Sequence, residues 1–456
     1  MKHIVLSLAV MFFTCGCSVY KSYSRPDDIK TDNLFGDIIQ TDTTTIASVP
    51  WQQFFRDSQL RALIDSGLTN NSDLKIASLR VDQAEATLSA ARLAYLPGIS
   101  LNPQGNIICL NGEKAAKTYS LGLSADWEID IAGRMTNEKR RALATLRQQE
   151  NYRQAVLTRL VSTIANTYFS LLMADEQLYI SELSLGAWDE IIRTLEVRKK
   201  VGETNEAAVA QARASRLEVE SSILSLSLQI KTLENSMCTL LGRAPGPIDR
   251  GKLESQTFPD SLSTGIPLQM LENRPDIKEA EYALQAAFYN TNAAKGAFYP
   301  SLTLGGTFGW TNNTGAAIVN PGNWLLNALG SLTQPIFNKG RNIANLKITK
   351  AQQEEALINF RQKLLEAGAE VNNALTQWQN AQLRLDISRR QIEALENAVR
   401  STRLLMTHSS ASSYLEVLTA QQSLLSARLS ATQETFDKIQ GVIKLYHALG
   451  GGKTDS

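Results

Sequence analysis

Histidine, a common choice for proton transfer and zinc binding, occurs only at His3, His408 and His447. None of the three has a partner at the spacing of a catalytic triad or a metal site, so we expect surface roles for His408 and His447. The glycine-rich stretch at residues 450–454 resembles a phosphate loop. However, His447 stands where that motif needs its first glycine, and no helix follows. The sequence therefore predicts no enzyme, no metal site and no cofactor.

Cysteine offers a different chemistry near the N-terminus, in Thr14-Cys15-Gly16-Cys17-Ser18. Lys2 and an apolar run of about ten residues precede it, as in a signal peptide, and the run is too short to span a bilayer. The small residues before Cys17 predict a lipoprotein cleavage site, with residues 1–16 removed and a palmitate-bearing lipid on Cys17. Thr14 replaces the usual leucine, so an ordinary secretory signal remains the alternative. Ser18 lacks the aspartate that retains many lipoproteins at the inner membrane.

Charge and hydropathy exclude two further classes. The chain of 456 residues has 46 Lys+Arg against 45 Asp+Glu, which argues against a nucleic-acid partner. Beyond the signal, no run of about 18 apolar residues predicts a membrane-spanning helix.

An internal repeat organises the remaining chain. Asp73-Leu74-Lys75 matches Asp276-Ile277-Lys278, at an offset of 276 − 73 = 203 residues. Ala94-Tyr95-Leu96-Pro97 matches Ala297-Phe298-Tyr299-Pro300 at the same offset. Gly133-Arg134 matches Gly340-Arg341 at an offset of 340 − 133 = 207. Each half is therefore one copy of a single structural unit.

Each copy contains a segment of alternating polarity, typical of strands with one apolar face. Residues 118–131 alternate throughout, and residues 301–310 repeat the pattern, with noisier partners at 99–110 and 324–337. Such lengths suit a transmembrane barrel, although the edge of a soluble sandwich shows the same period. A membrane barrel needs about eight strands to close. Four strands per chain therefore require several chains.

A long helix with a seven-residue apolar repeat follows the strands in each copy, which predicts coiled packing. The heptad positions are Leu157, Ile164, Leu171, Leu178, Leu185 and Ile192 in the first copy, and Leu357, Leu364, Val371, Trp378, Leu385, Ile392, Val399 and Met406 in the second. Ala367, Ala374, Ala381 and Ser388 add a stripe of small residues. Residues 134–200 contain no proline and correspond to about 100 Å of helix. Short polar turns at 201–206 and 408–413 precede returning helices.

Together these features resemble the TolC-like outer-membrane factors, in the lipidated branch that serves resistance-nodulation-division efflux pumps. The resemblance covers nearly the whole mature chain. Its segments are Trp51-Gln52-Gln53-Phe54-Phe55-Arg56-Asp57, Asn273-Arg274-Pro275-Asp276-Ile277, Ala297-Phe298-Tyr299-Pro300-Ser301-Leu302, Pro335-Ile336-Phe337-Asn338-Lys339-Gly340-Arg341 and Tyr414-Leu415-Glu416-Val417-Leu418-Thr419-Ala420-Gln421.

The resemblance implies a mostly α protein with a β-barrel part. In a homotrimer, 3 × 4 = 12 strands would close one outer-membrane barrel, and the helical hairpins would continue it as an α-barrel into the periplasm. A lipid anchor would hold the chain on the periplasmic side of the outer-membrane lipid. A periplasmic adaptor of an inner-membrane pump would dock at the hairpin tips, which are Val201, Gly202, Glu203, Thr204, His408, Ser409, Ser410 and Ser412.

The resemblance also implies a periplasmic gate just after the second turn, formed by Leu415, Glu416, Leu418 and Thr419. Leu415 and Leu418 would form an apolar collar, and Glu416 a ring of negative charge. Thr419 replaces an aspartate that is common in the family. The plain alternative for Glu416 is a solvated residue stabilised by the helix dipole.

The resulting layout has six parts: a signal peptide (1–16), a lipidated extended segment (17–50), a first repeat (51–242), an equatorial linker (243–267), a second repeat (268–450) and a flexible tail (451–456). Strands are expected at about 98–132 and 300–337, and helical hairpins at about 134–241 and 340–449. The function implied is a passive gated exit duct of a tripartite efflux system. The alternatives are the exit duct of a type I protein secretion system or a structural coiled-coil envelope lipoprotein.

Overall fold

The structure is a computed structural model that describes Tyr20, residues 22–26, Ile46 and residues 49–109, 111–112, 115–258, 273–312, 323–408 and 414–452. The predicted lipidation residue Cys17 lies outside these residues. The chain divides into two compact units. Unit 1 comprises Met1–Ile29, Leu79–Glu150 and Glu279–Gln362, and unit 2 comprises Lys30–Ser78, Asn151–Lys278 and Lys363–Ser456.

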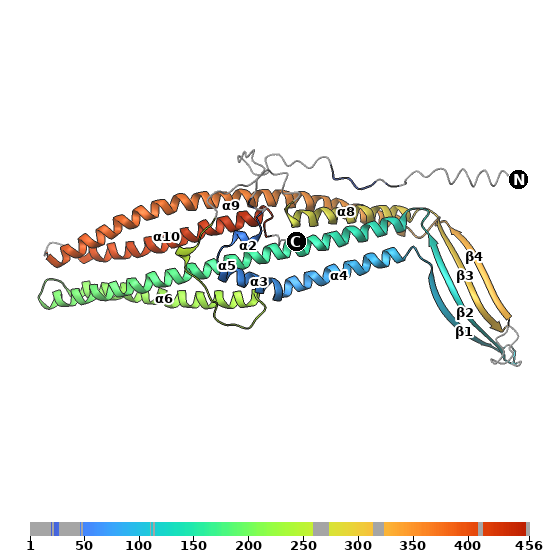
Figure 1. The fold of residues 1–456 in the computed structure, drawn as a ribbon, viewed down its shortest axis with the longest axis horizontal. Helices are drawn as coiled ribbons and strands as arrows, with labels where there is room; N and C mark the ends of the chain where they lie inside the picture. Colours follow the sequence, from blue (N-terminus) through green and yellow to red (C-terminus); the bar gives the residue numbers. More distant parts are fainter. Residues whose placement is uncertain are drawn as a thin grey trace. The chain divides into compact units, whose positions relative to one another are not determined.

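Unit 1 contains a four-stranded antiparallel sheet, whose strands lie in chain order (Figure 1). The strands are β1 (Gly98–Ile108), β2 (Ala116–Ile129), β3 (Ser301–Asn312) and β4 (Asn323–Thr333). The sequence predicted strand to about 337, but β4 ends at Thr333, two residues before Pro335, which has no N–H to donate to a ladder. Within the described residues, β1 and β4 each pair on one side only.

The register confirms the predicted faces of the sheet. Leu121 lies opposite Trp310 and Leu123 opposite Phe308, so the apolar sets of β2 and β3 share a face. On the other face, the hydroxyl groups of Ser100 and Ser124 form a hydrogen bond of 2.7 Å. The side-chain period of two thus places one apolar and one polar surface on opposite sides of the same sheet.

Aromatic side chains lie toward both ends of the apolar face. The rings of Phe308, Trp310 and Trp324 have centroids 5.1 to 6.4 Å apart on β3 and β4. Toward the other end of β2, the indole of Trp127 donates a 2.9 Å hydrogen bond to the carbonyl of Tyr95. Aromatic girdles on either side of an apolar band are typical of outer-membrane strands, because amphipathic rings favour the membrane interface.

The remaining elements are helical. They are α2 (Trp51–Phe54), α3 (Ser58–Asn70), α4 (Ser72–Leu93), α5 (Arg134–Lys200), α6 (Glu206–Leu240), η2 (Leu253–Ser255), α8 (Pro275–Gly296), α9 (Arg341–His408) and α10 (Tyr414–Ala448). The observed range of α5 is the one predicted from the sequence. By length and composition α5 includes one 18-residue window that could cross a membrane, but 61% of that window is buried, as in a core helix.

The heptad residues face the interior as predicted, since all of them are buried or half-buried. The small-residue stripe of α9 is fully buried at Ala367, Ala374, Ala381 and Ser388. Close packing of α10 on α9 is visible at Gly441, where an added Cβ would lie 3.0 Å from the Cα of Trp378. Small side chains here allow the two helix backbones to approach closely.

The two returning helices end alike, as the repeat predicts. At the end of α6, the N–H of Arg243 donates to the carbonyl of Cys238, and Gly242 adopts φ +63°. At the end of α10, the N–H of Gly451 donates to the carbonyl of Tyr446, and Gly450 adopts φ +91°. Each is a Schellman termination, in which glycine takes the left-handed position. Gly451 and Gly452, expected in a flexible tail, are buried.

Candidate functional site

The first hairpin turn, in unit 2, is defined by backbone caps. The N–H of Glu203 donates to the carbonyl of Arg198 at 2.9 Å, and Gly202 adopts φ +82°, which favours glycine. Asn205 then caps α6 by accepting a 3.0 Å hydrogen bond from the N–H of Ala208. Glu203 also forms an ion pair with Arg198 at 3.0 Å. Val201, Gly202 and Glu203 are exposed and Thr204 is half-buried, so this turn offers a firm, accessible surface.

The second hairpin turn joins α9, which ends at His408, to α10, which begins at Tyr414. Ser409, Ser410 and Ser412 lie outside the described residues.

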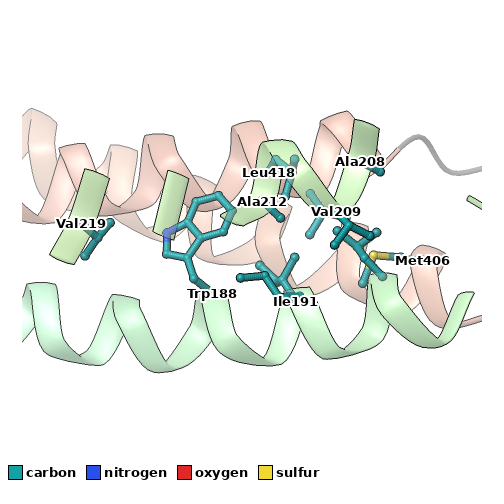
Figure 2. Packing of buried hydrophobic residues seen from close by; sticks show 11 residues of the cluster. Trp188, Ile191, Ala208, Val209, Ala212, Val219, Met406 and Leu418 are labelled. Carbon is teal, nitrogen blue, oxygen red and sulfur yellow. The ribbon is translucent and has the colours of Figure 1, made fainter. Parts of the chain in front are cut away.

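Below the turns, a hydrophobic core connects the two hairpins (Figure 2). We call it the tip core; its buried members are Trp188, Ile191, Ile192, Leu195, Ala208, Val209, Ala212, Val219, Met406, Val417 and Leu418. Residues of α5 and α6 thus pack against residues of α9 and α10. The guanidinium of Arg198 adds a polar tie, because it donates to the main-chain carbonyl of Met406.

The four predicted gate residues do not share one surface. Leu415 is 57% exposed, and Glu416 and Thr419 are also exposed. Leu418 is only 4% exposed and belongs to the tip core. Leu415 and Leu418 therefore lie on different faces of α10 within one chain. The helical period explains the difference, since Leu418 falls with Val417 and Gln421 on the inward face of α10.

Two hollows flank the tip core. The basic groove, of about 480 Å³, lies among α5, α9 and α10, and its rim includes Arg400, Arg403 and Arg428. Arg428 donates to Glu396 at 2.7 Å. The serine groove, of about 470 Å³, lies among α5, α6 and α10 and is lined by residues that include Ser215, Ser222, Ser426 and Ser430. Both grooves run between helices, a shape that fits a helical partner.

A buried arginine, for which the sequence pattern predicts no role, holds the opposite end of α10. Arg274 is 4% exposed, donates to Asp276 at 2.6 and 3.0 Å and to Glu370 at 2.7 Å, and also donates to the carbonyl of Ala448 at 2.9 Å. In the first repeat, the equivalent position is Asn71, which donates to the carbonyl of Leu240 at 2.9 Å. The repeated position itself was the available signal, because 71 + 203 = 274.

The ionisation of this cluster follows from its geometry. Burial raises the pKa of Asp276, but the hydrogen bonds and charge of Arg274 outweigh it, so the pKa lies below its usual value. Burial, followed by the nearby charge of Arg274, lowers the pKa of His447. The expected surface role of His447 is therefore wrong, because the side chain is half-buried beside this cluster.

A second hydrogen-bonded cluster holds the start of α3. The carboxylate of Asp57 caps the helix through the N–H groups of Gln59 and Leu60 and accepts hydrogen bonds of 2.8 Å from Tyr168 and Gln256. Burial raises the pKa of Asp57, and these hydrogen bonds more than offset it, so the pKa is lowered. Both clusters tie the end of a helix to other segments of unit 2. Among the described residues, no group of three or more His, Cys, Asp or Glu could hold a metal ion.

Comparison with known proteins agrees with this architecture. The family model described as outer membrane efflux protein matches residues 63–243 and 266–451. The cation efflux system protein CusC of Escherichia coli K12 is 32% identical over 461 residues, covering 98% of this chain and 99% of CusC. The probable outer membrane lipoprotein SilC of Salmonella typhimurium is 30% identical over 456 residues, covering 98% of each chain.

Solved structures give the same result. A crystal structure of CusC has a TM-score of 0.85 and 30% identity, covering 96% of this chain and 100% of that one. The open state of the MtrE outer membrane channel of Neisseria gonorrhoeae has a TM-score of 0.86 and 26% identity, covering 96% and 99%. The chain therefore belongs to the outer membrane efflux protein family and is the outer-membrane channel component of an efflux system.

Proposed function

We propose that three copies of this chain form one passive exit duct. The observation that carries the proposal is the four-stranded sheet of unit 1, whose edge strands β1 and β4 each pair on one side only within the described residues. A membrane offers no water to unpaired backbone groups, so the two edges need partners. Twelve strands from three chains supply them, because β1 of one chain then pairs with β4 of the next. The duct does no chemistry of its own.

The hairpin tips are the proposed docking surface for a periplasmic adaptor that links the duct to an inner-membrane pump. Two features support this proposal. The first hairpin turn is exposed, and the basic and serine grooves between the helices could each accept part of a partner. The second turn, with His408, Ser409, Ser410 and Ser412, completes the proposed surface.

The pump is proposed to select the cargo. Relatives that cover 88% or more of this chain are named for the efflux of cations, pyoverdine and toluene. Ducts of similar sequence thus serve cargoes of unlike chemistry. This supports an exit that does not recognise one compound.

The trimer is tested by mass measurement in detergent. We expect a particle of about three chain masses, because four strands per chain cannot close a barrel. A monomer that inserts stably into lipid would contradict the proposal.

Lipid attachment at Cys17 is tested by metabolic labelling with palmitate. We expect label on the parent protein and none on Cys17→Ser, because the substitution removes the thiol to which the lipid is attached. Cys109→Ser is the matched control and should keep its label. Undiminished label on Cys17→Ser would locate the modification elsewhere or exclude it.

Glu416 is proposed to line the closed end of the duct together with Leu415 and Thr419. Three exposed carboxylates around one axis attract cations, so Glu416→Gln should lower the cation preference of single channels by about twofold or more. Glu206→Gln is a matched control in the first turn of α6, where the carboxylate is already paired with Lys199. Equal ion selectivity in parent and Glu416→Gln would place Glu416 outside the conducting path.

A further inference from the structure

The polar face of the four-stranded sheet of unit 1 contains very few charged residues. Within the four strands, the only charged residues are Lys117, Asp126 and Glu128, all on β2. Lys117 lies opposite Ile107 near the far end of β2, in register with the apolar face. Asp126 and Glu128 belong to the polar face, which otherwise presents hydroxyls, amides, glycines and a few apolar side chains.

The acidic residues near the end of β2 differ in their partners. Glu128 is paired with Arg134, at 2.6 and 2.7 Å. Asp130, just after the strand, caps α5 through the N–H groups of Met135 and Thr136 at 3.1 and 2.7 Å. Asp126 makes no hydrogen bond or ion pair with any residue in the described part of the chain. No ion pair with a described residue therefore compensates its charge.

The register also leaves Asp126 uncovered. Its cross-strand neighbours are Gly98 on β1 and Gly305 on β3, so neither side presents a side chain. An added Cβ at Gly305 would lie 3.3 Å from the Asp126 carboxylate. Two glycines thus leave this carboxylate exposed on the polar face, where a neighbouring side chain would otherwise pack or screen it.

We propose that Asp126 is a charge filter of the outer-membrane barrel, which favours passage of cationic solutes over anionic ones. The inference rests on the proposed trimeric duct, in which the polar face of the sheet lines the lumen. Three carboxylates then surround the water-filled path at one level. The filter discriminates between solutes by the sign of their charge and not by their chemical identity.

The size of the barrel makes the effect measurable. With strands about 4.8 Å apart and tilted by about 40°, a twelve-stranded barrel has a backbone radius of about 12 Å. The Debye length is about 10 Å at 0.1 M salt and about 3 Å at 1 M. The electrostatic potential of the three Asp126 carboxylates therefore acts on ions in the lumen at low salt and is largely screened at high salt.

The test is the reversal potential of single channels of the full-length protein in planar bilayers, across a KCl gradient near 0.1 M. All variants carry Glu416→Gln, so that charge at the periplasmic end does not mask the barrel. We expect Asp126→Asn to lower the cation-to-anion permeability ratio by about twofold or more, and Asp126→Lys to favour anions. Both differences should shrink at 1 M KCl.

Two further variants separate lumen charge from other effects. Lys117→Gln, the matched control, removes a charge from the other face and should leave the ratio unchanged. Asn327→Asp places a carboxylate on the same polar face, on β4, and should restore cation preference to Asp126→Asn. Conducting channels with equal ratios in the Glu416→Gln protein with and without Asp126→Asn would overturn the charge filter alone. Absence of channels from the parent protein would instead overturn the proposed duct.

Discussion

Replacing Arg274 with methionine is expected to destabilise unit 2 by about 3–5 kcal/mol, because removal of one partner leaves a buried ionic cluster uncompensated. The side chain is 4% exposed and donates hydrogen bonds to Asp276, Glu370 and the carbonyl of Ala448. Methionine keeps much of the volume but none of the donors. Chemical denaturation in detergent measures the loss, and faster amide exchange at the end of α10 would localise it.

Lys363→Met is the matched control, because it breaks the exposed ion pair with Glu366 at 3.0 Å. Its expected cost is below about 1 kcal/mol.

The pH dependence of stability gives a second readout. In the parent protein the lowered pKa of Asp276 contributes stability that is lost as pH falls through that folded-state value. In Arg274→Met the unpaired carboxylate of Asp276 favours its protonated form. The difference in unfolding free energy between the parent and this variant should therefore shrink on acidification. Equal stability of both variants would contradict a structural role for Arg274.

Replacing Trp188 with alanine is expected to cost about 3–5 kcal/mol and to make the closed duct leak. Trp188 is 1% exposed in the tip core, where it packs with residues of both hairpins (Figure 2). Its indole nitrogen has no hydrogen-bond partner among the described residues, so the loss is one of packing. Val417 and Leu418 belong to the same core, and the exposed Leu415, Glu416 and Thr419 lie beside them on α10.

Single-channel conductance and cell sensitivity to a large antibiotic measure the leak. Trp188→Phe keeps an aromatic ring in the core and should remain close to the parent in both assays. A destabilised Trp188→Ala protein with unchanged conductance would show that the resting duct is closed somewhere other than beside the tip core.

The inward direction of Leu418 and the buried polar clusters depend on contacts between distant parts of the chain. The position of the gate segment came from resemblance to a family, but the inward direction of Leu418 depends on how α10 packs against the other helices. The sequence motif that contains Arg274 does not predict its role, because its partners Glu370 and Ala448 lie far along the chain. His447 was expected at the surface for the same reason.

Local residue patterns are sufficient to predict several features of this fold. Alternating polarity specified the strands and their faces, the seven-residue repeat specified the buried side of the long helices, and glycines at 202, 242 and 450 marked helix ends. These follow from the periods of the backbone and from the φ angles that glycine permits. Which charges are compensated depends instead on contacts between distant segments. Arg274 has partners from three segments, and Asp126 lies between Gly98 and Gly305 from two other strands. Coulombic and packing energies depend on distances in space, and no spacing along the chain supplies those distances.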